Sequence, residues 1–503
     1  MHTWLLLEMG ADAFPDRIAV ASPDGGVSLG ELAARARGAA AWLAQQDGDK
    51  LVFLGLNGPA LPAAFFAAGL AGKAFAPLNY RLPNDDLNKL LARTAPSIAV
   101  VDDDMLGRLE AAPGVTLAPR SLFEAKCLDP KLRAAELADV QPDIAVILFT
   151  SGTTGEPKAA VLRHSNLTSY VISTVEFMGA DEDEAILVAM PPYHVAGLAA
   201  VLSSIYGGRR IAYLPNFTPQ DWVSLAAAER VTNAMVVPTM LGRILDELEK
   251  RGERLPFLRH LAYGGGRMPQ PLIERALADL EHVDFANAYG LTETSSTIAV
   301  LGPEDHRAAV ASGDPNIRRR LGSVGRPLPT LELEIRGPEG EVLPPGAQGE
   351  IYVRGDQVAG EYMHRRVIRD DGWFPTNDSG WLDEEGYLFL EGRLDDIIVR
   401  GGENISPGEI EDVLRSHPNV SDAAVFGLPD EEWGERVAAV IVPGEGCPSA
   451  EELSAWVKER LRSTKTPETW DFREALPYND TGKLLRRILK AELHQTSSKT
   501  RSR

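Results

Sequence analysis

Cysteine is scarce in this sequence of 503 residues, which contains only Cys127 and Cys447. The two lie far apart and lack the spacing of metal ligands, which argues against both a disulfide framework and a structural zinc site. Such cysteine usage is typical of proteins in a reducing compartment, so we expect a cytoplasmic location.

Basic residues are also in deficit. The chain has 51 Lys and Arg against 72 Asp and Glu, which gives a formal net charge of −21. Proteins that bind nucleic acid or anionic membranes need an excess of Lys and Arg, so we expect no nucleic-acid partner. A nucleotide is still compatible with this charge, because it needs only a local cluster of backbone N–H groups and a few cations.

Long apolar runs are missing as well. The run Trp4–Leu7 is ended by Glu8 and has no basic flank, so it does not have the pattern of a signal peptide. No stretch reaches the roughly 18 apolar residues of a membrane-spanning helix. We expect no integral membrane segment, and loose peripheral contact with a membrane stays open.

The sequence predicts an α/β protein of at least two domains, because 503 residues exceed what one hydrophobic core usually supports. Apolar residues recur at helical spacing over 29–46, and the short apolar runs 50–54 and 97–101 are typical of buried strands. Helical and strand patterns alternate as far as residue 300, which indicates largely parallel sheets.

The pattern changes from about residue 320. Segments 331–336 and 349–354 alternate apolar and polar residues, which predicts a smaller antiparallel, β-barrel-like part that closes the large domain. A compact α+β unit follows the break near 393–396. Its predicted elements are helix 407–416, strand 422–427, strand 437–442 and helix 449–463.

These patterns divide the chain into two domains. We expect a large N-terminal domain of α/β subdomains over 1–394 and a small mobile α+β domain over 395–503, with a hinge at Asp395. The polar tail 496–503 is predicted to be disordered.

A segment rich in hydroxyl and glycine residues follows the apolar run 144–149. It comprises Thr150, Ser151, Gly152, Thr153, Thr154, Gly155, Glu156, Pro157 and Lys158. Its backbone N–H groups and hydroxyls are suited to wrap phosphate oxygens, and Lys158 adds a charge suited to the β- and γ-phosphates. The spacing is not that of a Walker P-loop. Taken by itself, the composition fits an ordinary surface turn equally well.

A second segment comprises Asn287, Ala288, Tyr289, Gly290, Leu291, Thr292, Glu293 and Thr294. Tyr289 offers a ring that can stack on a base, Thr292 a hydroxyl for a phosphate, and Glu293 a hard oxygen ligand for Mg²⁺. The alternative is a plain helix start, with Thr292 as its N-cap.

Together these segments resemble the adenylate-forming superfamily, which comprises acyl- and aryl-CoA synthetases, nonribosomal adenylation domains and luciferases. Three further stretches continue the resemblance in the same order: 372–378 (GWFPTND), 392–396 (GRLDD) with RGGENI after it, and 479–483 (NDTGK). They are similar to the ribose-binding stretch, the hinge and the catalytic-lysine loop of that superfamily. The resemblance covers nearly the whole chain, is weakest over the first 140 residues, and is greatest to the acyl-CoA synthetases.

The resemblance implies a role for each matching residue. Asp378 and Arg393 would bind the ribose of ATP, and Lys483 would reach the carboxylate and the α-phosphate once the small domain closes. His194 would gate the mouth of the acyl pocket. Taken singly, Asp378 and Arg393 fit surface charges and Lys483 a turn lysine better than these roles, and His194 fits a packed side chain equally well. The implied nucleotide- and coenzyme-contacting set also contains Thr150, Ser151, Gly152, Thr153, Thr154, Gly155, Lys158, Gly264, Gly265, Gly266, Asn287, Ala288, Tyr289, Gly290, Gly401 and Gly402.

The implied activity is ATP-dependent conversion of a hydrophobic carboxylic acid to an acyl-adenylate, followed by transfer to coenzyme A. The implied cofactors are ATP, Mg²⁺ on Glu293, and coenzyme A. Rotation about Asp395 would then swing Lys483 out and bring Gly401 and Gly402 in to line a narrow thiol tunnel.

The sequence limits the acid substrate only to a broad chemical class. The segments expected to line its pocket are mainly apolar or small, and Ala288 stands where relatives that activate dicarboxylates carry a basic residue. Medium-chain fatty, aryl and polycyclic acids all fit, and Arg267 is interpreted as a surface ion pair or a substrate contact. An acyl-AMP ligase that loads a separate carrier protein is the alternative activity. A catalytically silent binder is disfavoured because Lys483 and Glu293 are both present, and a homodimer is left open.

Overall fold

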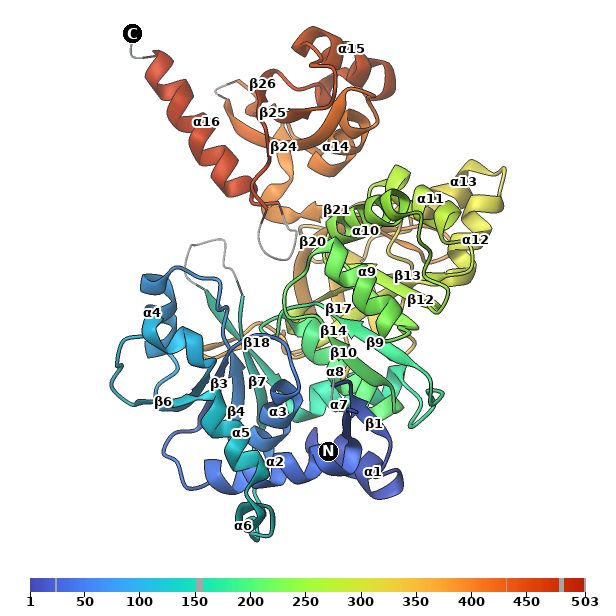
Figure 1. Ribbon diagram of the computed structural model, residues 1–503. Coiled ribbons are helices and arrows are strands. Elements are labelled where there is room, and N and C mark those ends of the chain that lie inside the picture. Colours follow the sequence, from blue (N-terminus) through green and yellow to red (C-terminus); the bar gives the residue numbers. More distant parts are fainter. Residues whose placement is uncertain (23–24, 151–156, 431, 479–483, 502–503) are drawn as a thin grey trace.

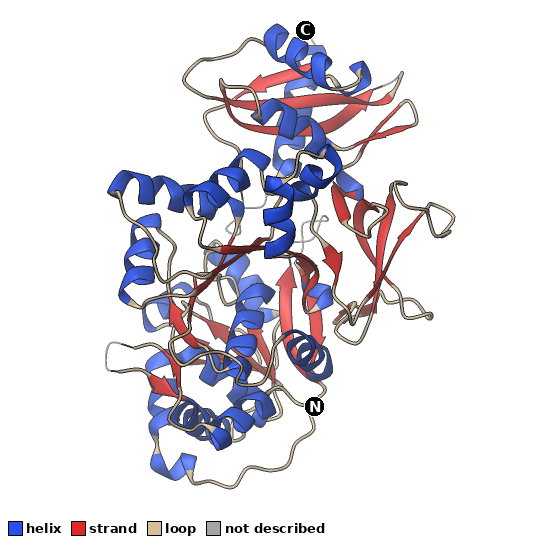
Figure 2. Ribbon diagram, turned by 90° about the vertical axis from the view of Figure 1, so that its right-hand side faces the viewer, coloured by secondary structure: helices blue, strands red, loops and turns tan. Residues whose placement is uncertain are grey.

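The computed structural model describes residues 1–503 except 23–24, 151–156, 431, 479–483 and 502–503. In Figure 1 the small domain, coloured orange to red, stands above the large one, and Figure 2 shows its strands lying between helices. The described helices of the large domain are α1 (Trp4–Ala13), α2 (Leu29–Leu43), α3 (Ala60–Leu70), α4 (Asn84–Ala92), α5 (Arg120–Leu128), α6 (Pro130–Arg133), α7 (His164–Thr174), α8 (Val195–Gly207), α9 (Pro219–Ala228), α10 (Pro238–Arg251), α11 (Gln270–Asp279), α12 (Pro303–Ala311) and α13 (Pro315–Arg318).

One large sheet has the order β15-β14-β13-β12-β11-β9-β10-β1-β2. Its strands are β1 (Ile18–Val20), β2 (Val27–Ser28), β9 (Ala185–Val188), β10 (Arg210–Tyr213), β11 (Asn233–Val236), β12 (His260–Gly264), β13 (Asp284–Leu291), β14 (Ser296–Leu301) and β15 (Arg326–Pro327). From β13 through β1 the neighbouring strands run parallel. Their carboxyl ends therefore lie along one edge, the usual place for a ligand in such sheets.

The second large sheet has the order β19-β18-β8-β7-β4-β3-β5-β6. Its strands are β3 (Lys50–Leu54), β4 (Ala74–Pro77), β5 (Ser97–Val101), β6 (Val115–Pro119), β7 (Ile144–Thr150), β8 (Lys158–Arg163), β18 (Glu361–Tyr362) and β19 (Arg365–Arg366). The core of the domain fills the space between the two sheets and α1, α2, α3 and α8. Helix α3 is buried over residues 60–69, because its sequence is apolar on every side.

A third, antiparallel sheet has the order β16-β17-β20-β21. Its strands are β16 (Glu332–Arg336), β17 (Gly349–Arg354), β20 (Phe374–Leu382) and β21 (Leu388–Arg393). The alternating segments 331–336 and 349–354 thus form β16 and β17, as their period of two predicts.

The small domain has a core of its own. Strands β22 (Ile398–Arg400), β23 (Glu403–Ile405), β24 (Val420–Asp430), β25 (Gly434–Pro443) and β26 (Thr469–Phe472) form its sheet, and its helices are α14 (Pro407–Arg415), α15 (Ala450–Arg460) and α16 (Arg486–Arg501). One face of β24 and β25 packs on α14 and α15, and the other face packs on α16 through Leu489. The predicted two-domain α/β architecture is confirmed.

The structure differs from the prediction at the carboxyl end of the chain. Residues 496–501, expected to be disordered, continue α16 as far as Arg501. Leu489 anchors the helix in the core, and a helix that has been nucleated extends at little further cost, which the polar composition alone did not reveal. No helix among the described residues is long and apolar enough to cross a membrane.

Candidate active site

The strands β7 and β8 flank the predicted phosphate-binding segment. Thr150 and Lys158 are register partners, and the Thr150 hydroxyl donates to the carbonyl oxygen of Lys158 at 3.4 Å. Ser151, Gly152, Thr153, Thr154 and Gly155 lie outside the described residues. The antiparallel pairing of β7 with β8 brings the two ends of the segment together on adjacent strands of a large sheet.

Lys158 and Glu293 are brought together by a third residue, Tyr362. The Lys158 ammonium lies 5.8 Å from the centre of the Tyr362 ring, and the Tyr362 hydroxyl donates to Glu293 Oε1 at 2.5 Å. Burial and the Glu293 carboxylate raise the pKa of Tyr362, so the hydroxyl keeps its proton and remains a donor. Sequence reasoning missed Tyr362, because nothing in its neighbourhood shows that β18 pairs with β8.

Glu293 lies in the short 3₁₀ turn η2 (Thr292–Thr294) between β13 and β14. Leu291, not Thr292, occupies the N-cap position, so the interpretation of Thr292 as a helix cap was wrong. The Glu293 carbonyl accepts from the backbone N–H groups of Ala359 and Gly360, each at 2.9 Å. These bonds place the carboxylate beside Tyr362.

Glycine is required at position 290, just before this turn. A Cβ there would lie 1.9 Å from the carbonyl oxygen of Ser296 on the paired strand β14. Gly290 therefore permits the close approach of β13 and β14 that presents Glu293.

Asp378 and Arg393 face each other across β20 and β21 as register partners. Arg393 Nη1 donates to Asp378 Oδ1 at 3.0 Å, and the Tyr289 hydroxyl donates to Asp378 Oδ2 at 2.6 Å. Asp378 is 7% exposed, so its carboxylate is held in one geometry by charge-assisted bonds. Arg393 also interacts electrostatically with Glu293 and Tyr362. Tyr289, Glu293, Asp378 and Arg393 thus form one group.

The predicted glycine segment lies at the carboxyl end of β12. Gly264 pairs with Ala288 of β13, and a Cβ at Gly264 would meet the Ala288 carbonyl oxygen at 2.3 Å. Gly265 has a φ of +74°, which L residues rarely adopt. The neighbouring Asn287 amide donates to the Ser323 carbonyl oxygen at 3.0 Å, which holds the end of β13 in place.

His194 follows β9 at the same edge of the sheet and is the N-cap of α8. Its Nδ1 accepts from the backbone N–H of Ala196 at 3.4 Å. Burial lowers the pKa of His194 to about 4, so the imidazole is neutral at physiological pH. The carboxyl ends of the adjacent strands β9, β11, β12 and β13 therefore present His194, Val237, Gly265 and the Glu293 turn in order.

The small-domain residues are placed differently. Gly401 and Gly402 form the two-residue turn between β22 and β23, with φ values of +57° and +83°. A Cβ at Gly401 would lie 2.9 Å from the Trp433 ring, whereas a Cβ at Gly402 would have no described atom within 4 Å. Gly401 thus contacts Trp433 of its own domain, to whose carbonyl oxygen its N–H also donates at 2.8 Å. Lys483 lies outside the described residues, and Asp395 accepts from the Asn377 amide at 3.1 Å.

Glu293 fits a magnesium ion that is shared with phosphate oxygens. Among the described residues, no group of three or more His, Cys, Asp or Glu could enclose a metal. A protein typically binds Mg²⁺ through one or two carboxylates and leaves the other positions to substrate phosphates and water. A single carboxylate close to the phosphate-side Lys158 matches that pattern.

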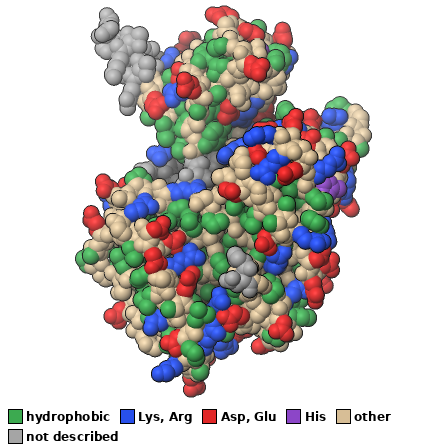
Figure 3. Space-filling model, viewed as in Figure 1, with side chains coloured by type: hydrophobic (Ala, Val, Ile, Leu, Met, Phe, Trp, Pro, Cys, Tyr) green, Lys and Arg blue, Asp and Glu red, His purple; other side chains and the backbone are tan. Residues whose placement is uncertain are grey.

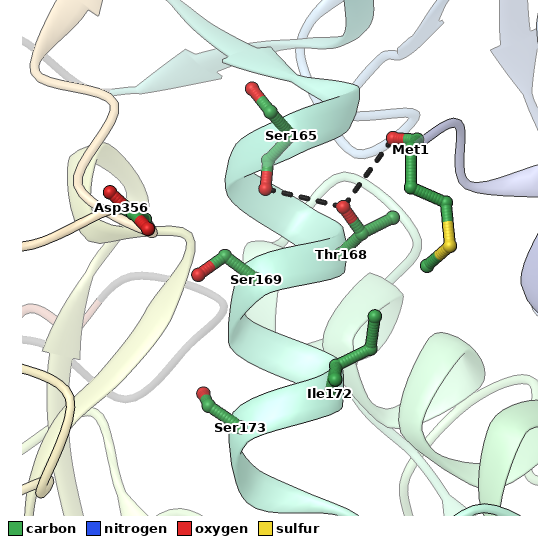
Figure 4. A pocket seen from close by; sticks show the side chains of 7 residues that line it. All are labelled: Met1, Ser165, Thr168, Ser169, Ile172, Ser173 and Asp356. Carbon is green, nitrogen blue, oxygen red and sulfur yellow. Dashed lines mark hydrogen bonds between the residues drawn. The ribbon is translucent and has the colours of Figure 1, made fainter.

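A surface pocket of the described residues lies elsewhere. Figure 4 shows it along one side of α7, where Thr168 Oγ1 bonds to the carbonyl oxygens of Ser165 and Met1. Its lining is Met1, Ser165, Thr168, Ser169, Ile172, Ser173 and Asp356. None of the predicted site residues belongs to it.

The fold and this group of residues define a two-domain α/β enzyme of the nucleotide-binding, adenylate-forming class. The chain belongs to the AMP-binding enzyme family: the family's main domain matches residues 7–363, and its C-terminal domain matches 409–483.

Similar proteins support this assignment. A feruloyl-CoA synthase of Amycolatopsis sp. is 35% identical over 448 residues, which cover 88% of each chain. The fatty acid–[acyl-carrier-protein] ligase ScoC of Streptomyces coeruleorubidus is 32% identical and covers 88% of this chain and 86% of its own. The o-succinylbenzoate CoA synthetase of Bacillus subtilis, solved with its acyl-adenylate intermediate, has a TM-score of 0.83 at 30% identity and covers 97% and 98% of the two chains. The same synthetase has been solved with ATP and magnesium ion.

Proposed function

We propose that this protein is an acyl-CoA synthetase: it activates a hydrophobic carboxylic acid with ATP as an acyl-adenylate and transfers the acyl group to coenzyme A. AMP and pyrophosphate are the other products. The observation that carries the proposal is the grouping of Lys158, Tyr362 and Glu293 with Asp378 and Arg393. These residues come from three sheets, and the resemblance to the family assigns Lys158, Glu293, Asp378 and Arg393 to the nucleotide and its metal.

In the first half-reaction the acid carboxylate attacks the α-phosphorus and pyrophosphate leaves. Two anions must meet while charge grows on the departing phosphates, so positioning and electrostatic stabilisation dominate. Lys158 stabilises the leaving phosphates, Asp378 and Arg393 orient the ribose, and Lys483 neutralises the carboxylate and the α-phosphate. A magnesium ion held by Glu293 would supply further charge neutralisation at the phosphates.

In the second half-reaction a thiol attacks the carbonyl carbon of the mixed anhydride and AMP leaves. Lys483 has no task in this step and would obstruct the thiol. Rotation of the small domain about Asp395 removes it and brings in the Gly401–Gly402 turn, whose two residues lack side chains that would narrow the thiol path.

The chemistry of the acyl pocket favours an uncharged tail. Val236, Val237 and Ala196 are buried, and the neutral His194 adds no charge. Arg267, the cation nearest in sequence to the glycine segment, is bound to Asp412. An aryl or fatty acid fits this lining, in keeping with relatives named for feruloyl and fatty-acid substrates.

The acceptor can be tested directly. Purified protein is screened for pyrophosphate release with a panel of medium-chain fatty, aryl and polycyclic acids, and the best acid is then offered coenzyme A or a holo carrier protein. Thioester formation with coenzyme A supports the proposal. Transfer only to the carrier protein would make the chain an acyl-AMP ligase, the activity class of the ScoC relative.

The role of Lys483 gives a second test. Lys483→Ala should abolish adenylate formation, because no other group is assigned to neutralise both anions, and should leave thioester formation from preformed acyl-adenylate nearly unchanged. Single-turnover measurements of each half-reaction check this. Equal loss in both steps would refute the division of labour between the two domain positions.

The proposal includes a cytoplasmic location. Cys127 and Cys447 are both free, as expected in a reducing compartment. Acidic and basic side chains are interspersed over the face shown in Figure 3, in keeping with a protein whose partners are small molecules. A homodimer, and a separate carrier protein as acyl acceptor, are further partners that gel filtration and the transfer assay would detect.

A further inference from the structure

An ion pair joins the two domains in addition to the chain connection. Arg267 directly follows the glycine segment of the large domain, and Asp412 lies on α14 of the small domain. Arg267 Nη2 donates to Asp412 Oδ2 at 2.5 Å, with side-chain exposures of 41% and 39%. This explains the isolated arginine of the sequence as an ion-pair partner rather than a substrate contact.

The contact requires a close approach of the two domains. A Cβ at Gly408 would lie 2.4 Å from Arg267 Nη1, so the guanidinium rests against the backbone of the second residue of α14. The first N–H groups of a helix carry partial positive charge, which disfavours a cation there. Asp412 supplies the compensating charge, so the approach of Arg267 depends on it.

Asp412 is partly withdrawn from solvent at the contact. Burial raises its pKa, while the neighbouring Arg267 acts in the opposite direction. Its second oxygen, Oδ1, is buried and has no hydrogen-bond partner among the described residues. Arg415 also acts on this carboxylate electrostatically, but Arg267 is the hydrogen-bond donor to it.

The pair depends on the position of the small domain. The Ser406 hydroxyl also bonds across the domains, to the Glu391 carbonyl oxygen at 2.7 Å, but both residues lie close to the proposed hinge. A rotation about Asp395 that turns α14 away from the glycine segment would separate Asp412 and Gly408 from Arg267. In the orientation seen here the Gly401–Gly402 turn contacts its own domain, which is the arrangement expected before the thiol step.

We propose that Arg267 and Asp412 form a latch that holds the small domain in the orientation for adenylate formation and opens when the domain rotates. Arg267 is thus a positioning residue for the first half-reaction. The inference rests on the proposed function, because it assigns the observed orientation to the first of its two steps.

The test measures both half-reactions in the full-length enzyme. Because the pair is partly exposed, Arg267→Ala and Asp412→Asn should each slow single-turnover adenylate formation by about two- to fivefold. Thioester formation from preformed acyl-adenylate should be unchanged or faster. The effect of either substitution should shrink at high salt, which already screens the pair in the unmodified enzyme.

A charge swap separates the latch from other roles of Arg267. Arg267→Asp alone should slow adenylate formation most, because two carboxylates then face each other, and addition of Asp412→Arg should restore the rate to within about twofold. Arg275→Ala is the matched control, since Arg275 pairs with Asp246, Glu249 and Asp279 inside the large domain. It should leave both half-reactions unchanged.

Two results would overturn the latch. One is an equal loss in both half-reactions, which indicates a folding or substrate-binding role for Arg267. The other is failure of the swap to restore the rate. The unmodified enzyme keeps the two proposals apart: failure to release pyrophosphate with every acid of the panel would contradict the proposed function, whereas the latch is contradicted only by the behaviour of its own variants.

Discussion

At the scale of single residues, Tyr362 connects the phosphate-side lysine to the proposed metal ligand. Its hydroxyl donates to Glu293 Oε1 and its ring lies beneath the Lys158 ammonium. A hydrogen bond to a charged group contributes more than a neutral one, which makes this hydroxyl a sensitive point of the site.

Tyr362→Phe removes only that hydroxyl. We expect kcat/KM for MgATP to fall by about ten- to a hundredfold, because a bond to a charged group is typically worth about 1.5–3 kcal/mol. The Mg²⁺ concentration needed for half-maximal rate should rise. Initial rates over a matrix of ATP and Mg²⁺ concentrations measure both. Tyr289→Phe, which loses its bond to Asp378 instead, is the control and should weaken ATP binding without changing the Mg²⁺ requirement.

His164 makes stability depend on pH. It is 3% exposed, its Nδ1 accepts from Thr3, and burial lowers its pKa to about 3 from the ordinary 6.5. Between pH 6.5 and 3 the His164 imidazole therefore binds a proton in the unfolded chain but not in the folded chain. The contribution of neutral His164 to the free energy of unfolding is complete above pH 6.5. It falls as the pH drops from 6.5 to 3, by about 1.4 kcal/mol per pH unit.

Urea unfolding of the large domain at pH 7.5 and 5.0 tests this expectation. The midpoint should fall on acidification in the unmodified protein and fall less in His164→Gln, which has no imidazole to protonate. An identical drop in both proteins would show that other groups cause the acid sensitivity.

At the scale of elements, tight turns and strand pairs explain most of the glycines at the site. Gly264 and Gly290 permit strand contacts that a Cβ would prevent. Gly401 and Gly402 have the positive φ values that a two-residue hairpin turn requires, so the fold needs them even before any thiol passes.

Substitutions at Gly402 separate the backbone requirement from the space requirement. Gly402→Ala should destabilise the small domain by about 1 kcal/mol, because a residue with a Cβ is strained at positive φ, and Gly402→Asn should cost less. Both should slow thioester formation from preformed acyl-adenylate, since each adds a side chain to the thiol path. Thermal melts and single-turnover rates provide the two measurements.

Gly340→Ala serves as the control in the large domain. Gly340 has a φ of +84° and no described atom within 4 Å of a Cβ, so it matches Gly402 in geometry. Its substitution should destabilise the hairpin of β16 and β17 and leave the thiol step unchanged. A normal thiol step in Gly402→Asn would show that the turn does not line the path.

At the scale of the whole molecule, two independent cores make domain movement feasible. The small domain buries its own apolar residues on both faces of its sheet, and the chain connection passes through the short turn η4 (Leu394–Asp396). The contacts between the domains include two polar ones, the Arg267–Asp412 pair and the bond from Ser406 to Glu391. Such interfaces are compatible with relative motion.

Asp395→Pro should trap one domain position, because proline fixes φ and removes a backbone donor at the proposed hinge. We expect one half-reaction to be lost and the other to be retained in single-turnover assays. Asp395→Ala removes the bond from Asn377 but keeps backbone freedom, so it should retain both. Full rates in both steps for the proline variant would place the hinge elsewhere.

The sequence predicted much of this arrangement from local signals. Apolar periodicity located α2, β3 and β5, and the alternating segments located β16 and β17, since these patterns follow from the geometry of one element. The sequence did not predict that the carboxyl-terminal helix α16 continues to Arg501. Its stability comes from Leu489 in the core rather than from the composition of 496–501.

The sequence by itself determined the class of fold, the division into two domains and the motifs, because each depends on residues that are close together in the chain. Only the tertiary structure decided which residues meet. The bond between Tyr362 and Glu293, the placement of Asp378 between Tyr289 and Arg393, and the pairing of Arg267 with Asp412 all join segments from separate sheets or domains. Strand order and domain packing set these distances, and neither leaves a signal in the local sequence.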